Sequence, residues 1–497
     1  MNYFNSTTFI RLGLPAVCVT AFCLRALAAR GELWLDEIWS IVMVRQLITS
    51  PLEIITELRH DNNHFLNSLW IYLQPSDALD FDYRLLAVIS GTLSVMLAMA
   101  IGRRSGNSTM WVAAVIFSTS YLLVHYSSEA RGYGPLCFAV LLAVWSDRNI
   151  QAHRLLFWEI LYCLSCLLGF LAHAAFIQFW LPSVLAAGWS LMMTNRQLSV
   201  GTRLSRSVAP LIFRVLLPGS FFLWLWWVNL SRMQIGGGSE VRYLNVILQT
   251  MSAAVGGPLD QNLAPAGALM MLVLLILIVR FQIQQNPKDA LILVGSAVVV
   301  PAALLFVMKR QDIYPRYFLI GVVLFQLALS QWLGSLIVHA AGNTSISRRI
   351  SGVVIFTGFT IANLSADLRL INLQRGHYQD ALEWIAGYQD SQADQTSEKH
   401  AGDELIHLAT DHPFRHGLPL NYFVSRTSLN GRLELAEQPS GLTDWILTHD
   451  LQSATSPPAE IDIKTSGHFA LKRTFRRAPL SGWDLMLYKR EKASLVE

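Results

Sequence analysis

The chain is dominated by long apolar runs, and this feature limits what it can fold into. A helix needs about 20 apolar residues to cross the hydrocarbon core of a bilayer. Charged residues are 14% of the 497 residues, whereas soluble domains carry about 25%, so a soluble protein is excluded. We expect a multi-span α-helical membrane protein with about eleven transmembrane helices. The runs lie at 8–29, 84–102, 109–125, 132–146, 155–172, 174–192, 209–229, 264–282, 288–308, 316–338 and 350–370.

Basic residues alternate between the loops, which predicts the orientation of the chain. Short loops rich in Lys and Arg are retained in the cytoplasm. The basic residues of one side are Arg103, Arg104, Arg148, Arg154, Arg196, Arg203, Arg206, Arg280, Lys288, Arg348 and Arg349. The first loop of the other side, 31–83, carries nine acidic residues and only two arginines, so we expect it to be external. The compact loops are typical of a bacterial cytoplasmic membrane, although they do not exclude the endoplasmic reticulum.

The charge density changes near Asn372. The last 125 residues hold 13 Lys and Arg and 17 Asp and Glu, about twice the density of the preceding part. This predicts a transmembrane domain over 1–372 with net charge +8 and an external soluble domain over 373–497 with net charge −4. Short apolar runs in the tail predict a small α/β or α+β domain. The overall charge of +4 gives no reason to expect a nucleic-acid partner.

The external loops carry their own patterns. Residues 38–47 and 65–73 have apolar residues at helical spacing and interfacial aromatics, which predicts two helices that lie on the membrane surface as a lid or platform. The loop 231–263 contains Gly236-Gly237-Gly238, a composition that permits mobility and closure over a substrate.

Several short motifs follow one another in a fixed order. They are Trp34-Leu35-Asp36-Glu37, Asp61-Asn62-Asn63-His64, Tyr83-Arg84-Leu85, Tyr126-Ser127-Ser128-Glu129-Ala130-Arg131-Gly132-Tyr133, His173 and Tyr314-Pro315-Arg316-Tyr317. Together they resemble the GT-C fold membrane glycosyltransferases, and more specifically the bacterial branch similar to protein O-mannosyltransferases and lipid A aminoarabinose transferases. The resemblance implies inverting transfer of a sugar from a polyprenyl-phosphate donor to an envelope lipid, glycan or protein on the external face.

The first motif supplies the candidate catalytic residues. Asp36 lies at the expected external membrane boundary, where partial desolvation raises the basicity of a carboxylate. By resemblance it is the general base, and Glu37 orients either Asp36 or the acceptor. The alternative is that both acids cap the N-terminus of the helix expected over 38–47, where negative charge is favoured.

A second group of residues suits the donor phosphate. Lys309, Arg310 and Arg316 form a basic group on the external side, opposite to the topology rule, and arginine matches phosphate in a bidentate geometry. Arg131 joins them by resemblance. The alternative for Lys309, Arg310 and Arg316 is that they anchor helix ends at the membrane surface. The alternative for Arg131 is a structural ion pair with Glu129.

Four further residues are candidate substrate ligands. Asp61 and His64 are three apart and would converge on one helical turn, while Glu129 and His173 lie in short external turns. His173 is equally explained as a core histidine. We expect no tightly bound metal or other cofactor, because a two-residue cluster is a weak metal signal, but a loosely bound Mg²⁺ or Mn²⁺ beside the phosphate stays open. In the tail, Asp411, His412 and His416 are interpreted as a turn with surface histidines rather than a metal site.

Other functions remain as alternatives. A ligase or polymerase of polyprenyl-linked glycans would also work externally on a lipid carrier. A transporter or flippase would need charges at span centres and paired inverted repeats, neither of which the sequence displays. A catalytically inactive scaffold would be expected to lack Asp36. The tail is predicted to bind the acceptor or to stabilise the enzyme.

Overall fold

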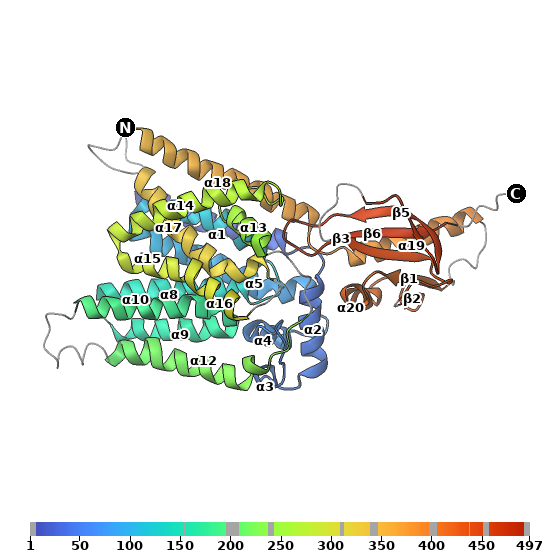
Figure 1. Cartoon of the computed structure of the whole chain (residues 1–497), viewed down its shortest axis with the longest axis horizontal. Coiled ribbons are helices and arrows are strands. Elements are labelled where there is room, and N and C mark those ends of the chain that lie inside the picture. The colour runs from blue at the N-terminus through green and yellow to red at the C-terminus, as the bar shows by residue number, and fades with distance from the viewer. Residues whose placement is uncertain are drawn as a thin grey trace. The chain divides into compact units, whose positions relative to one another are not determined.

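The computed structural model describes residues 6–153, 155–194, 208–236, 243–308, 313–337, 346–396, 405–436, 438–450 and 457–491. These residues form two compact units (Figure 1). The first unit contains the chain up to Ala29 and Met43–Leu368, and it is helical. The second contains Arg30–Val42 and the chain from Arg369 onward, and it is built around a β-sheet.

Each of the eleven apolar runs coincides with one or more helices. The helices of this part are α1 (Ser6–Ala28), α3 (Glu53–Thr56), α4 (Phe65–Leu73), α5 (Asp80–Arg103), α6 (Asn107–Thr119), α7 (Tyr121–Tyr126), α8 (Tyr133–His153), α9 (Leu156–Ala172), η1 (Ala174–Phe176), α10 (Ile177–Thr194), η3 (Leu211–Leu216), α12 (Leu217–Val228), η4 (Leu230–Arg232), α13 (Tyr243–Ala254), α14 (Ala264–Gln285), α15 (Pro287–Val294), η5 (Gly295–Val299), α16 (Val300–Met308), η6 (Pro315–Phe318), α17 (Leu319–Ile337) and α18 (Ile346–Leu373).

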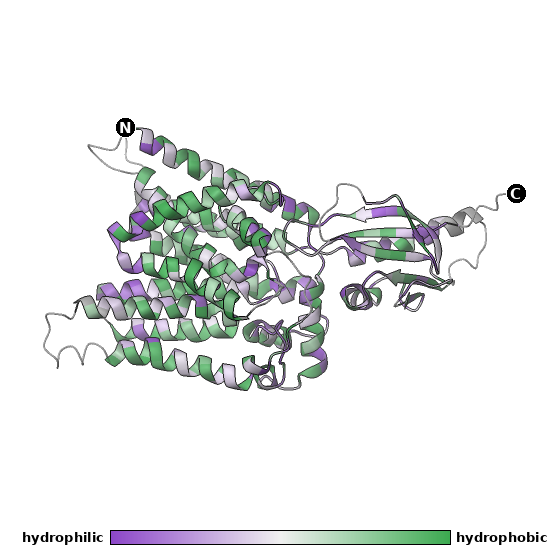
Figure 2. Cartoon of the chain, viewed as in Figure 1, coloured by the Kyte–Doolittle hydropathy of each residue, from purple (hydrophilic) through white to green (hydrophobic). Residues whose placement is uncertain are grey.

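Within the described residues, six helical segments are long and apolar enough to cross a membrane, and two shorter helices are also apolar. Figure 2 shows apolar residues over most of the length of these helices. The expected fold class, an integral membrane protein of many helices with a small C-terminal α/β domain, is confirmed. The count of eleven spans stays a prediction.

Small residues bring α5 and α8 close together. A Cβ atom on Gly134 of α8 would lie 2.6 Å from the carbonyl oxygen of Ala87 in α5. One on Gly91 of α5 would lie 2.4 Å from Cβ of Ser127, which follows α7 in the segment that leads to α8. Such residues let helix backbones approach closely in membrane proteins. The close approach fixes the end of α8 at which Tyr133 lies.

The two helices expected in the first external loop are present as α2 (Leu35–Leu47) and α4. The loop 231–263 also contains α13, a helix that the glycine-rich composition did not predict. Its end packs on the following segment, because Ser252 Oγ donates to the Pro258 carbonyl at 2.6 Å. The mobility expected for this loop stays a prediction, and Gly237 and Gly238 lie outside the described residues.

The second unit is a six-stranded mixed sheet in the order β2-β1-β3-β6-β5-β4. Strand β1 pairs in parallel with β2 and β3, and the remaining pairs are antiparallel. Ala409, Ile446, Phe469, Met486 and Tyr488 form a core cluster of the sheet. Its elements are α19 (Tyr378–Thr396), β1 (Ile406–Thr410), α20 (Pro413–Val424), β2 (Leu433–Ala436), β3 (Trp445–Asp450), β4 (Glu460–Ile463), β5 (Gly467–Phe475) and β6 (Asp484–Arg490).

Residues 30–42 pack with the C-terminal sheet domain, although the charge pattern placed them in the membrane domain. The Glu32 carboxylate accepts hydrogen bonds from the backbone N–H groups of Gln379 and Asp380, each at 2.9 Å, at the N-terminus of α19. The ring of Trp39 contacts Phe414 of α20 edge to face, with centroids 5.0 Å apart. A single boundary at Asn372 does not describe this division.

Candidate functional site

Three segments that are distant in sequence meet at one end of the helical unit. His64 precedes α4, Arg131 lies in the turn between α7 and α8, and His173 lies between α9 and η1. Arg131 Nε donates to His64 Nε2 at 3.2 Å. The His64 and His173 rings have centroids 4.7 Å apart, and the Tyr133 ring lies 5.3 Å from each. We call His64, Arg131, Tyr133, His173 and Arg316 the arginine–histidine cluster.

Close backbone packing holds the Arg131 turn in place. A Cβ atom on Gly132 would lie 2.0 Å from the Ala172 carbonyl oxygen and 3.0 Å from Cβ of His64, so only glycine fits. Asn67 of α4 donates from Nδ2 to the Ala130 carbonyl at 2.6 Å. The turn is thereby fixed against both α4 and the end of α9.

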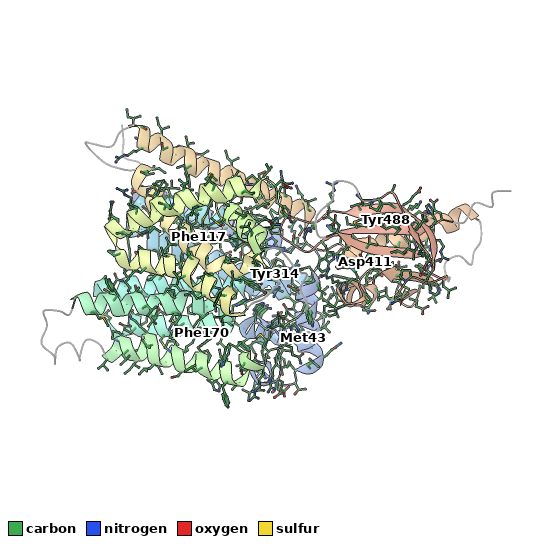
Figure 3. All side chains as sticks on the ribbon, viewed as in Figure 1. Met43, Phe117, Phe170, Tyr314, Asp411 and Tyr488 are labelled. Atoms are coloured by element: carbon green, nitrogen blue, oxygen red, sulfur yellow. The ribbon has the colours of Figure 1, made fainter. Side chains whose placement is uncertain are left out.

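Arg316 belongs to η6 and is stacked among aromatic rings. Its guanidinium carbon lies 4.2 Å from the centroid of Tyr314, which Figure 3 labels, and 5.9 Å from that of Tyr317. Burial and the nearby charges of Arg131 and Arg316 lower the pKa of His173 to about 3. Burial, His173 and the same two arginines hold the pKa of His64 well below its ordinary value. The two imidazoles are therefore neutral near pH 7, and the positive charge of the cluster is on its arginines.

The hydrogen bonds assign the ring proton of each histidine. His173 Nδ1 accepts from the Ala175 backbone N–H at 2.9 Å, so its Nε2 carries the proton. His64 Nε2 accepts from Arg131, which only donates, so its Nδ1 carries the proton. The cluster thus combines two guanidinium groups with neutral N–H donors, a set that suits an anionic oxygen.

Glu129 lies beside the cluster in the same turn. Its Oε1 is 3.2 Å from Nε2 of His125 in α7, and both side chains are 1% exposed. The Tyr126 and Tyr133 rings, with centroids 5.3 Å apart, connect this pair to the cluster. His125, Tyr126 and Tyr133 were not predicted as site residues, although Tyr126 and Tyr133 lie within the motif that contains Arg131.

The remaining predicted residues lie elsewhere. Asp36 and Glu37 are in the first turn of α2, in the second unit. Glu37 is fully buried, and its Oε2 accepts the Trp34 backbone N–H at 3.1 Å. This bond is the helix-capping alternative for Glu37. Asp36 is half-buried, and its role as general base stays a prediction.

The expectation that Asp61 and His64 share one helical turn is wrong. Both precede α4, which begins at Phe65, and Asp61 lies in a turn. Asp61 Oδ1 accepts the Gly236 backbone N–H at 3.2 Å and lies 3.1 Å from His60 Nδ1. Asp61 therefore contacts the 234–236 segment, while His64 contacts Arg131. Lys309 and Arg310 lie outside the described residues.

A second group of charges lies toward the opposite end of α8. Arg214 of η3 contacts Asp147 of α8 at 2.7 Å and Glu159 of α9 at 2.8 Å. Lys288 of α15 contacts Asp147 at 2.7 Å. We call these four residues the paired cluster, and two of them, Asp147 and Lys288, line a cavity of about 40 Å³. Sequence reasoning missed this cluster, because its members are spread over residues 147–288.

No known family model matches the chain. No curated protein matches it either. Among solved structures, ArnT from Cupriavidus metallidurans in the apo state is similar with a TM-score of 0.46 and 12% identity, over 97% of this chain and 98% of that chain. The same protein bound to undecaprenyl phosphate is similar with a TM-score of 0.43 and 14% identity, over 99% of each chain. Both TM-scores are below 0.5, and neither likeness assigns a role to a residue of this chain.

Proposed function

We propose that this chain is an inverting membrane glycosyltransferase that uses a polyprenyl-phosphate-linked sugar at the external face of a bacterial cytoplasmic membrane. The observation that carries the proposal is the arginine–histidine cluster. Arg131 and Arg316 lie close enough to His173 for both charges to lower its pKa, and Arg131 also donates to the neutral imidazole of His64. The multi-residue motifs that resemble those of GT-C enzymes contain four of the five cluster residues and the adjacent Glu129. The fifth cluster residue, His173, is a single-residue match in the same resemblance.

The proposed reaction is a single displacement. An acceptor hydroxyl oxygen attacks the anomeric carbon of the sugar, and the bond from that carbon to the phosphate oxygen breaks. The electron pair leaves with the polyprenyl phosphate, whose charge the guanidinium groups of Arg131 and Arg316 stabilise. The acceptor proton passes to Asp36, the proposed general base. His173 Nε2–H is a further donor to the phosphate or sugar oxygens.

The acceptor is proposed to be an envelope lipid, glycan or protein, because such acceptors present hydroxyl or amine groups at the external face. The second unit is proposed to bind or orient it. Asp36 lies in the first turn of α2 and belongs to the same unit, so it would receive the proton from an acceptor bound there. Asp61 and Glu129 are proposed to contact the donor sugar.

The test is transfer of radiolabelled sugar from a panel of polyprenyl-phosphate donors in membranes with matched amounts of each variant. We expect Asp36→Asn and Arg131→Met each to lower transfer by about 10²-fold or more. Asp77→Asn is the matched control, since Asp77 is an exposed acid of the same external loop. Transfer that survives Asp36→Asn would remove Asp36 from catalysis, and no transfer from any donor by the wild type would contradict the proposal.

A further inference from the structure

Three potential metal ligands converge in the C-terminal domain, outside the arginine–histidine cluster. Asp411 follows β1, His416 lies in α20 and His449 lies in β3. Asp411 Oδ1 is 3.0 Å from His416 Nε2, and Asp411 Oδ2 is 2.9 Å from His449 Nδ1. The two histidine nitrogens are 3.2 Å apart. The expectation of a turn with surface histidines is therefore wrong for His416, which is fully buried.

The topology of the sheet explains why these residues meet. Strand β1 lies between β2 and β3 and is parallel to both, with Thr410 paired to Leu447. The chain leaves β1 through α20 to reach β2 on one side and later returns to β3 on the other. In open α/β sheets the crevice at the carboxyl ends of such strands is the usual position of a ligand site. Asp411, labelled in Figure 3, and His449 lie at this edge.

The spacing of the three atoms matches a tetrahedral transition-metal site. Zinc binds histidine nitrogen and carboxylate oxygen at about 2.0–2.2 Å, which places neighbouring ligand atoms about 3.3 Å apart. The three atoms here are Asp411 Oδ1, His416 Nε2 and His449 Nδ1, and their separations are 3.0, 3.0 and 3.2 Å. Small side-chain shifts would open the triangle to the size of the metal. Two histidines and one carboxylate leave the fourth position open to water or a ligand.

Neighbouring groups already orient His416 as a ligand. Tyr378 Oη donates to the Arg415 carbonyl at 3.2 Å and accepts from Trp483 Nε1 at 3.0 Å. Its second lone pair faces His416 Nδ1 at 3.2 Å, so Nδ1 carries the ring proton. Nε2 then presents its lone pair to Asp411 and His449. Such hydrogen bonds to the far nitrogen are typical of metal-ligating histidines.

We propose that Asp411, His416 and His449 form a binding site for a divalent transition metal of the zinc class. The metal replaces the proton that His449 Nδ1 shares with Asp411. His449 then carries its proton on Nε2, which lies 2.7 Å from Arg415 Nη1, so the half-buried Arg415 side chain has to turn away. The site is independent of the proposed transferase activity, and it replaces the expectation of no tightly bound metal.

The experiment measures Zn²⁺ bound to the full chain, purified in detergent with an affinity tag that contains no histidine. Equilibrium dialysis and elemental analysis give the stoichiometry and the affinity. We expect one Zn²⁺ per chain, an affinity at least about tenfold weaker in His449→Gln, and a tighter affinity in Arg415→Ala. His407→Gln is the matched control, because His407 of β1 also faces a carboxylate, Glu434, at 3.1 Å. It should bind Zn²⁺ as the wild type does.

Two results would overturn the proposal. One is a wild-type chain that retains no Zn²⁺, and the other is a His449→Gln chain that retains it as tightly as His407→Gln does. Circular dichroism melting of each variant checks that the domain is folded. If His449→Gln is unfolded, the visible absorption of Co²⁺ bound to the wild-type chain decides instead. A four-coordinate spectrum supports the site, and a spectrum no different from aqueous Co²⁺ contradicts it.

Discussion

The two ends of α8 hold their charged side chains in different ways. Beside Tyr133, Arg131 donates to a neutral histidine and lies among aromatic rings. At Asp147, fourteen residues along and about 21 Å away by helical rise, Arg214 contacts two carboxylates and Lys288 shares one of them. The paired cluster thus holds cations and anions of the same chain together, whereas the arginine–histidine cluster places two arginines near histidine and tyrosine rings.

This difference separates a structural role from a ligand-binding role. Two carboxylates and two cations that contact one another inside a helical bundle leave little charge for an external partner. Guanidinium groups beside imidazole and tyrosine rings suit the binding of an anionic oxygen of a ligand. The paired cluster also bears on the transporter alternative, because its charges lie near helix ends and are compensated by one another.

The largest expected effect is at the paired cluster. Arg214→Met leaves Asp147 and Glu159 without their shared cation, and breaking a buried ion pair costs about 3–5 kcal/mol of unfolding free energy. Thermal unfolding of the purified protein should show this loss. The double variant Arg214→Met with Glu159→Leu should recover part of it, since Lys288 still contacts Asp147. An Arg214→Met protein as stable as the wild type would contradict a structural role.

At the arginine–histidine cluster we expect a loss of comparable free energy in the rate of sugar transfer, with little loss of stability. Arg316→Met should raise the barrier to sugar transfer by about 2.7–4 kcal/mol, or 10²–10³-fold in rate, as for the loss of one anion-stabilising donor. Arg103→Met is the control, because Arg103 is exposed at the end of α5. If Arg316→Met mainly destabilises the fold and transfers normally when folded, the two ends of α8 do not differ as argued.

The close approach at Gly132 gives a third test. Gly132→Ala places a methyl group 2.0 Å from the Ala172 carbonyl oxygen, so the turn must shift, which is expected to cost about 1–3 kcal/mol. Because the same turn carries Arg131, donor affinity should fall together with stability. The matched change Gly188→Ala in α10 meets no atom within 4 Å and should not destabilise the protein. Equal melting temperatures for the two variants would argue against the packed turn.

The smallest expected effect is a pH dependence of stability. The pKa of His173 is about 3 when folded and about 6.5 when unfolded, so the unfolded chain binds the extra proton. Stability from this group is complete above about pH 6.5 and decreases as the pH falls toward 3, by about 1–2 kcal/mol at pH 5. His173→Asn keeps a side-chain oxygen for capping and should reduce the fall in melting temperature between pH 7 and 5, leaving the part that comes from His64. The same slope in wild type and variant would remove His173 as its source.

The sequence predicted the helices well, because a spanning helix must be apolar over its whole length. The prediction that Arg131, His173 and Arg316 belong to one site came from their motifs. The pairing of Asp61 with His64 failed, because helical spacing was assumed where the chain makes a turn before Phe65. Helical spacing brings side chains together only where the chain is helical.

Groups assembled from distant parts of the chain could not be predicted from spacing. Arg214 and its partner Asp147 are 67 residues apart, and His449 and Asp411 are 38 apart. The second pair requires β1 and β3 to be neighbours, which depends on the strand order of a sheet rather than on local pattern. Asp411 and His416 alone therefore resembled an ordinary surface turn.

The division of the chain has a consequence for its biosynthesis. Residues 30–42 emerge early, just after the first apolar helix, but Glu32 caps α19 and Trp39 contacts Phe414. The segment can therefore reach its final packing only after the C-terminal part of the polypeptide has been synthesised. A chain that stops near Asn372 leaves this early segment without the helices that complete it, so C-terminal truncation also alters the surroundings of Asp36.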